Sequence, residues 1–333
     1  MTNDRDLSGA LRNAWRRVVS GAARYRNYPK LQARLRQTTK QVDRAQRRIG
    51  RLEQRAADLR ATNAAERART DENRRLYIKL LKHALMHTLY RPLDIGARSR
   101  HVEQNLDEEQ TRAQGRDWPQ YAQTMVGSRR LDNVRHCVET VLRDGIPGDF
   151  IETGVWRGGT VIFMRGILKA YGDPPGHQVV VADSFQGLPV ADSDQYPEDA
   201  PFVHNPDTET AARAGALAPS LLAIPQTDVR RNFELYGLLD ERVEFLEGWF
   251  KDTLPTVRDR AWSVIRLDGD FYESTMDGLV NLYPKLAVGG FLIIDDYSIP
   301  ACKQAVADYR NEHGIDDPIQ TIDWTGAFWR RGR

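Results

Sequence analysis

Two apolar stretches in the last quarter of the sequence end in carboxylates, in the segments SVIRLDGDFYEST and GGFLIIDDYS. The first ends at Asp268, and the second ends at the pair Asp295 and Asp296. Both stretches have the length and composition of buried strands. Because burying an unpaired carboxylate costs several kcal/mol, these acids require a partner or a cation. Hard oxygen ligands without His or Cys favour Mg²⁺ or a similar divalent ion over zinc.

A divalent ion held in this way could bind an alcohol oxygen, lower its pKa and orient it for attack. Asp268 would lie beside that oxygen, which makes it the candidate catalytic base. Glu273 follows in the same segment and is a second candidate. Its position suits the capping of the next helix equally well.

A second group of candidate residues comes earlier, in the segment IETGVWRGG. Its glycines allow close approach of the backbone to a ligand. Their spacing matches neither G-x-G-x-x-G nor the phosphate-loop pattern, which disfavours NAD and a nucleoside triphosphate. Asp183 ends the next apolar strand, where an acid accepts hydrogen bonds from both hydroxyls of a ribose. Together these features indicate an adenosine-type cofactor without a pyrophosphate.

The elements around these residues alternate between strand and helix patterns from about residue 130. We expect an α/β fold, a doubly wound Rossmann-like sheet with helices on both faces. The segment PIQTIDWTGAFWRR is expected to add a hairpin of two strands. Ligands of such sheets lie beyond the carboxyl ends of the strands. The acids expected at this edge are Glu152, Asp183, Asp268, Asp295 and Asp296. A bound polyol and a cation explain five such acids better than separate helix caps do.

The N-terminal part of the chain has a different character. Residues 1–75 hold 20 Lys and Arg against 8 Asp and Glu, whereas the remainder holds 28 against 38. Apolar or small residues follow a heptad spacing that predicts a coiled-coil helix over residues 30–75. This seam comprises Leu31, Leu35, Thr38, Val42, Ala45, Ile49, Leu52, Ala56, Leu59 and Asn63.

The excess of Arg in this arm has two interpretations. It suits contact with nucleic acid or an acidic membrane, or it forms the solvated outside of a coiled coil. No aromatic residue interleaves the basic ones between Leu31 and Arg75, which favours the coiled coil. The arm is therefore predicted to be an oligomerisation or docking element, most simply in a homo-oligomer.

The two cysteines, Cys137 and Cys302, lie far apart and lack the spacing of metal ligands. This predicts free thiols in a reducing compartment. The sequence has no apolar run long enough to span a membrane, and its polar opening does not resemble a signal peptide. We therefore expect a cytoplasmic protein.

Eight motifs occur in an order that resembles one family. They are TMVG, IETGVWRGG, VADSFQGLP, GWFKDTLP, RLDGDFYEST, YPKLAVGG, IIDDY and IDWTGAFWRR. Between about Arg74 and Arg333 the chain resembles the macrocin O-methyltransferase family (TylF-like). The resemblance implies an enzyme that moves a methyl group from S-adenosylmethionine to a sugar hydroxyl of an antibiotic-type glycoside, with Mg²⁺. The residues before about 70 lie outside it.

The resemblance also assigns residues to roles. Those implied for the methyl donor are Thr124, Met125, Glu152, Thr153, Gly154, Val155, Trp156, Asp183, Ser184, Phe185, Gln186, Gly187, Trp249, Phe250 and Asp268. Asp268, Asp295 and Asp296 become the metal ligands, with Asp268 also the proton acceptor. The expected domains are a basic segment 1–29, the coiled coil 30–75, a helical cap or linker 76–125 and the methyltransferase domain 126–333.

Three other interpretations stay open at this point. A catechol-type methyltransferase would keep the chemistry and change the acceptor. A scaffold protein would depend on the coiled coil and carry an inactive α/β domain, against which the intact set of acids argues. A dehydrogenase is disfavoured by the glycine spacing. The polar segment from about residue 190 to 225 is expected to form a lid over the acceptor.

Overall fold

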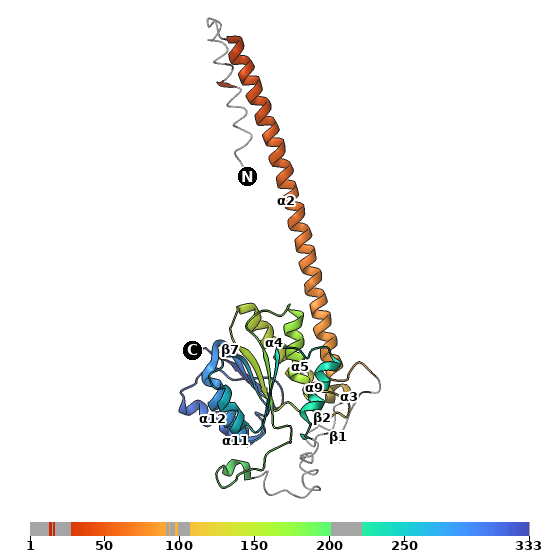
Figure 1. Cartoon of the computed structure of the whole chain (residues 1–333), viewed down its shortest axis with the longest axis vertical. Helices are drawn as coiled ribbons and strands as arrows, with labels where there is room; N and C mark the ends of the chain where they lie inside the picture. Colours follow the sequence, from red (N-terminus) through yellow and green to blue (C-terminus); the bar gives the residue numbers. More distant parts are fainter. Residues whose placement is uncertain are drawn as a thin grey trace. The chain divides into compact units, whose positions relative to one another are not determined.

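A computed structural model describes residues 13, 14, 16, 28–90, 93, 97, 98, 107–200 and 222–332 (Figure 1). The chain divides into two compact units, Met1–Glu72 and Asn73–Arg333. The expected basic segment 1–29 falls almost entirely outside the described residues. The second unit contains the sheet and all the acids considered above.

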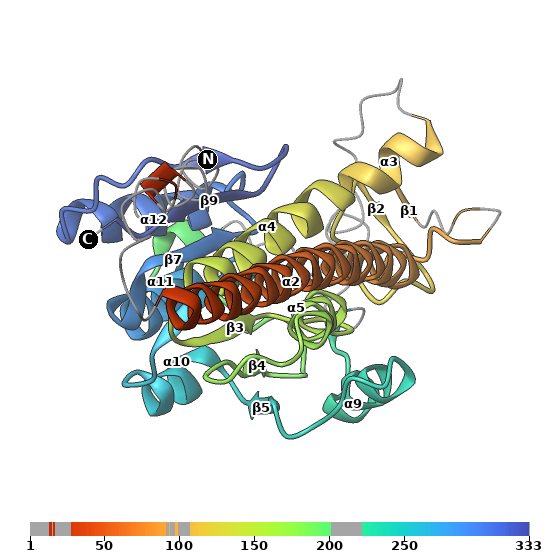
Figure 2. The same ribbon diagram turned by 90° about the horizontal axis from the view of Figure 1, so that it is seen from above.

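The second unit is built on a seven-stranded sheet with the order β5-β4-β3-β6-β7-β9-β8. The strands are β3 (Asp149–Thr153), β4 (Val179–Asp183), β5 (Val243–Glu247), β6 (Trp262–Leu267), β7 (Leu286–Ile294), β8 (Gln320–Thr321) and β9 (Ala327–Arg330). Figure 2 shows β3, β4 and β5 side by side. The first five strands are parallel, and β9 runs antiparallel to both β7 and β8. The strand order reverses at β3, where β4 lies on one side and β6 on the other. A ligand site is expected at this point.

Successive residues of the central strands point to opposite faces of the sheet. One hydrophobic core contains Phe150, Val181 and Val264, and the other contains Ile151, Val180 and Ile265. Because both faces are covered, the central strands are mostly apolar, as their sequences indicated. The expected α/β sheet with helices on both faces is confirmed.

Helices cover the two faces in separate sets. Besides the end of the long N-terminal helix, the helices described in the second unit are α3 (Glu108–Gln114), α4 (Ser128–Asp144), α5 (Gly159–Ala170), α9 (Gln226–Leu235), α10 (Phe250–Thr253), α11 (Tyr272–Leu282) and α12 (Pro300–Glu312). Residues of α4, α5 and α9 belong to the first core, and residues of α11 and α12 belong to the second (Figure 1). A small antiparallel pair, β1 (Ala97–Arg98) and β2 (Asp117–Trp118), lies apart from the main sheet.

The helix α2 (Tyr28–Leu85) begins in the first unit and ends in the second. Ile78, Leu81 and Leu85 are buried in the first core of the second unit. The expected boundary at residues 75 and 76 thus falls inside one helix, three residues after the division between the compact units.

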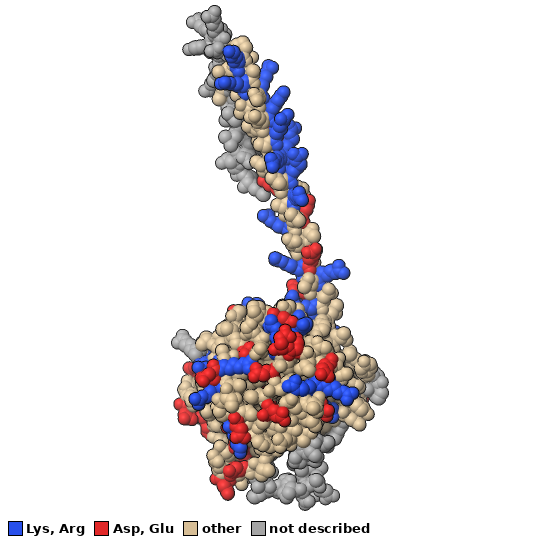
Figure 3. Space-filling model, viewed as in Figure 1, with Lys and Arg blue, Asp and Glu red and all other residues tan. Residues whose placement is uncertain are grey.

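The part of α2 in the first unit exposes its apolar seam. Lys and Arg side chains follow the same helix (Figure 3). The exposed seam residues are Leu31, Leu35, Val42, Ile49, Leu52 and Leu59. The helix is present as expected, but its coiled-coil pairing stays a prediction.

The predicted C-terminal hairpin is confirmed by β8 and β9. Helices α9 and α12 and the pair β1–β2 were not predicted. Of the expected lid, residues 201–221 lie outside the described residues, while a 3₁₀ turn, η2 (Pro197–Asp199), precedes them. Among the described residues, none of the helices is long and apolar enough to cross a membrane.

Candidate active site

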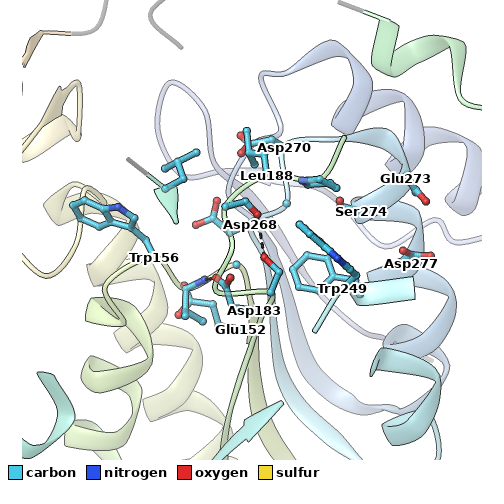
Figure 4. Close-up of a pocket in the computed structure, with 18 of the residues that line it drawn as sticks. Glu152, Trp156, Asp183, Leu188, Trp249, Asp268, Asp270, Glu273, Ser274 and Asp277 are labelled. Atoms are coloured by element: carbon cyan, nitrogen blue, oxygen red, sulfur yellow. Dashed lines mark hydrogen bonds between the residues drawn. The ribbon is translucent and has the colours of Figure 1, made fainter. Parts of the chain in front are cut away.

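A cavity of about 380 Å³ lies at the carboxyl ends of β3, β4 and β6. Figure 4 shows Glu152 and Asp183 on one side of Asp268 and Asp270 on the other. The expected donor-site residues that line the cavity are Thr124, Met125, Glu152, Gly154, Val155, Trp156, Asp183, Ser184, Gly187, Trp249, Phe250 and Asp268. The structure thus gathers residues from several separate sequence motifs around one space.

The turn after β3 forms one wall of the cavity. Gly154 has a φ of +83°, a conformation that favours glycine, and its N–H donates to the carbonyl of Ala182 on β4. Gly158 is also left-handed and immediately precedes α5. The turn between β3 and α5 thus has three left-handed positions, of which two are glycines and the third is Trp156, with a φ of +49°.

Asp183 at the end of β4 fixes this turn. Its two carboxylate oxygens accept hydrogen bonds from the N–H groups of Val155 and Phe185, both at 2.7 Å. Burial raises the pKa of Asp183, and the backbone donors offset part of that increase. An ionised carboxylate only accepts hydrogen bonds, so Asp183 suits hydroxyl donors from a ligand in the cavity.

Three acids at the ends of β6 and β7 form a second cluster. One ligand oxygen each from Asp268, Asp295 and Asp296 lies within 4.8 Å of the other two. Burial and the negative charge of Asp295 raise the pKa of Asp268, and burial with its acidic neighbours raises the pKa of Asp296 well above the usual value. A divalent cation would relieve this crowding of negative charge. The residues present therefore fit a hard cation.

Two buried arginines contact the same cluster. Arg266 on β6 donates to Glu152, Asp268 and Asp295. Arg130 on α4 donates to the other oxygen of Asp295. Burial raises the pKa of Asp295, but the two guanidinium groups outweigh that effect and leave it below the usual value. Asp295 is therefore charged and fixed in orientation, which distinguishes it from Asp268 and Asp296.

Comparison with known proteins identifies the family. The macrocin-O-methyltransferase (TylF) family matches residues 70–331. The chain belongs to this family. Membership implies the use of S-adenosylmethionine as methyl donor. The match begins just before Asn73, where the second compact unit starts.

Curated relatives match this chain over nearly their whole length. One is the 8-demethyl-8-(2,3-dimethoxy-alpha-L-rhamnosyl)-tetracenomycin-C 4'-O-methyltransferase of Streptomyces olivaceus. It is 51% identical to this chain, and the match covers 78% of this chain and 94% of the relative. Another is the mycinamicin III 3''-O-methyltransferase of Micromonospora griseorubida, 48% identical over 77% of this chain and 96% of the relative. The solved structure of the O-methyltransferase NovP is 46% identical, with a TM-score of 0.68 over 78% of this chain and 100% of that one.

Three of the residues expected at the methyl-donor site of this TylF-family chain do not line the cavity. Thr153 is buried, and its hydroxyl has no hydrogen-bond partner within the described part of the chain. Phe185 packs in the first core with its ring centroid 6.3 Å from that of Phe245, and Gln186 is exposed. Thr153 follows Glu152 on a strand, so its side chain points to the opposite face.

Other cavity residues were not predicted. Asp270 has a φ of +59°, and burial with the nearby charges of Asp268 and Asp295 raises its pKa to about 7. Glu273, weighed above as a base, lines the cavity from the first turn of α11. Arg266 could have been found from sequence, because a lone charge inside the apolar run SVIRL needs a buried partner.

Proposed function

We propose that this chain transfers the methyl group of S-adenosylmethionine to a sugar hydroxyl of a glycosylated natural product, with Mg²⁺ in the acid cluster. The observation that carries the proposal is the position of Asp268. It lines the cavity beside Asp183 and also belongs to the cluster with Asp295 and Asp296. One carboxylate therefore adjoins both halves of the reaction.

The donor half of the cavity would hold S-adenosylmethionine through three features. Asp183 would accept the ribose hydroxyls, and the turn at Gly154 would let the amino-acid end approach the backbone. Trp249 and Phe250 line the cavity at the N-terminal end of α10, where they would pack against the adenine. These roles follow the family resemblance and agree with the geometry of the cavity.

The acceptor half would lie at the three clustered acids. When bound, Mg²⁺ would lower the pKa of the acceptor hydroxyl, and S-adenosylmethionine would supply the methyl group. Asp268 would accept the hydroxyl proton on a carboxylate oxygen, because it lines the cavity and also belongs to the acid cluster at which the hydroxyl would bind. Asp295 is fixed by two arginines and would therefore hold the bound cation at a constant position relative to the cavity.

The choice of a sugar acceptor rests on the relatives. Two of them are named as methyltransferases of a rhamnosyl tetracenomycin and of mycinamicin III, and both match this chain at about half of all aligned positions. The cavity also presents several aromatic side chains and a few acids, which suits a polar ring with apolar edges.

We also infer that the exposed seam of α2 pairs with a second copy of the chain. Its apolar positions recur at heptad spacing and are exposed in the single chain. The family match begins at residue 70, so this pairing would be a property of the arm and independent of the catalytic domain.

The proposed reaction is tested with isotopically labelled S-adenosylmethionine and a panel of acceptors. The panel contains rhamnosylated and other deoxyglycosylated aromatic and macrolide compounds beside simple catechols. We expect mass gain on a glycoside, with fragmentation that places the methyl group on the sugar. Transfer to catechols alone would replace the sugar acceptor by a phenol, and failure to bind S-adenosylhomocysteine in calorimetry would overturn the proposal.

A further inference from the structure

We propose that Arg266 is a positioning residue that couples binding of the methyl donor to binding of the divalent cation. The inference rests on the proposed function, because it takes the donor and the cation as ligands of the two halves of the cavity. It adds a physical connection between those halves that neither ligand provides.

Arg266 lies in the middle of the sheet and is fully buried. On the neighbouring strand β3, its register partner is Glu152. One terminal nitrogen of the guanidinium donates to Glu152 and also to Asp268 at 2.7 Å, and the other donates to Asp295. A single side chain therefore binds one acid on the donor side and two acids of the proposed cation cluster.

Glu152 has an oxygen available for a ligand. Its side chain is about 2% exposed and lines the cavity. Arg266 holds one carboxylate oxygen, while the other is buried with no hydrogen-bond partner among the described residues. A buried acceptor of this kind costs free energy unless a donor reaches it. A ligand in the donor half that supplies an N–H group would satisfy it.

The guanidinium group makes the connection rigid. Its donors are fixed in one plane, so the positions of the three acids depend on one another. A cation that fixes Asp268 and Asp295 also fixes Arg266 and, through it, Glu152. The methyl donor then binds a site whose side chains are already ordered, so the entropic cost of its binding is lower. This gives positive coupling between the donor and the cation. The coupling must be equal in both directions.

The test is a thermodynamic cycle measured by calorimetry, which reads binding independently of turnover. S-adenosylhomocysteine is titrated with and without Mg²⁺, and Mg²⁺ is titrated with and without S-adenosylhomocysteine. In the unmodified protein we expect each ligand to tighten the other by about five-fold or more, within the usual range for coupled sites. In Arg266→Lys, a single nitrogen cannot reach all three acids, so the factor should fall to about one.

Arg165→Lys is the matched control. Arg165 on α5 has a side chain that is 1% exposed, as Arg266 has, and it pairs with Asp173 and Asp240 away from the cavity. Loss of a buried ion pair should lower the unfolding temperature of both variants. Only Arg266→Lys should lose the coupling, because a merely structural role would leave the factor unchanged.

A coupling factor near one in the unmodified protein, or an unchanged factor in Arg266→Lys, overturns the inference and leaves the proposed reaction standing. Failure of the unmodified protein to bind S-adenosylhomocysteine at all overturns the proposed reaction. If Arg266→Lys does not fold, Glu152→Gln decides instead. It keeps the shape of the Glu152 side chain but leaves only one acceptor oxygen, which cannot serve both Arg266 and a ligand, so retained coupling there refutes the inference and lost coupling supports it.

Discussion

A Cβ atom placed on Gly154 would lie 1.9 Å from the backbone oxygen of Asp268. The turn after β3 and the end of β6 are therefore in direct backbone contact. This contact brings the proposed donor loop against the proposed catalytic acid. A change in one strand end must alter the position of the other.

Replacement of Gly154 by Ala should therefore harm both stability and ligand binding. Gly172 is the control, because its φ of +79° is close to the +83° of Gly154, while a Cβ atom placed on it would have no neighbour within 4 Å among the described residues. Gly172→Ala should cost about 1–2 kcal/mol in the free energy of unfolding, the usual cost of a left-handed residue. Gly154→Ala should cost more and should weaken S-adenosylhomocysteine binding at least ten-fold. Denaturant unfolding and calorimetry measure the two effects, and equal losses would contradict the contact.

Asp268→Asn should reduce turnover by about 10²–10⁴-fold, the range for loss of a general base. S-adenosylhomocysteine should still bind within a few-fold of its normal affinity, because Asp183 and the Gly154 turn remain. Glu273→Gln is the matched variant at the second candidate base and should lower turnover less than ten-fold. A larger loss in Glu273→Gln than in Asp268→Asn would transfer the proton-acceptor role to Glu273.

Removal of divalent ions should abolish methyl transfer. We expect EDTA treatment to stop the reaction and added Mg²⁺ to restore it, while S-adenosylhomocysteine binding survives with reduced affinity. Asp296→Asn should raise the Mg²⁺ concentration needed for half of full activity, since it removes one charged oxygen ligand. Full activity after exhaustive removal of metal would exclude the cation from the mechanism.

Asp199 anchors the described start of the expected lid to α11. Its buried carboxylate accepts hydrogen bonds from the N–H groups of Tyr272 at 2.6 Å and Glu273 at 3.1 Å. Asp199→Ala should cost about 1 kcal/mol of stability, as loss of a helix cap usually does. It should also raise the KM for the acceptor more than it lowers kcat, because Glu273 lines the cavity.

The control for Asp199 is Asp107→Ala, which removes the cap of α3. Asp107 is not among the residues that line the cavity. Its loss should cost comparable stability with no change in KM. A KM that rises equally in both variants would mean that a general loss of stability, and not the anchor, is responsible.

The seam of α2 is tested with two charged substitutions. Val42→Asp with Ile49→Asp should convert any oligomer to monomer in light scattering, because both residues belong to the exposed heptad seam. The control is Gln37→Asp with Ala57→Asp, which also introduces two aspartates into α2 but at positions outside the seam. It should leave the oligomer intact. A monomer before any substitution, at micromolar concentration, would refute the pairing.

The strands were predictable because the central strands are buried on both faces and are therefore mostly apolar, with Glu152 and Arg266 as charged exceptions. The acids at the sheet edge followed from the rule that ligands bind beyond the carboxyl ends of parallel strands. The bonds of Arg266 were not predictable, since they depend on the register that places it opposite Glu152. The prediction that Phe185 contacts the methyl donor also failed for a reason that the sequence does not show. Its φ is +57°, and its side chain lies in the first core.

The segment that follows α12 supports the proposed cation cluster through contacts with Arg130 and with the backbone of Asp295. Asp323 forms an ion pair with Arg130 at 3.2 Å, and the hydroxyl of Thr325 donates to the backbone carbonyl of Asp295. Strand β9 then lies between β7 and β8. A chain that ended just after Asp296 would keep both arginines that bind the Asp295 carboxylate, but it would lack Asp323, which pairs with Arg130, and Thr325, which binds the Asp295 carbonyl. The last residues of the chain therefore support the orientation of Arg130 and the backbone of Asp295, so a C-terminal truncation would loosen the acid cluster without removing any of its acids.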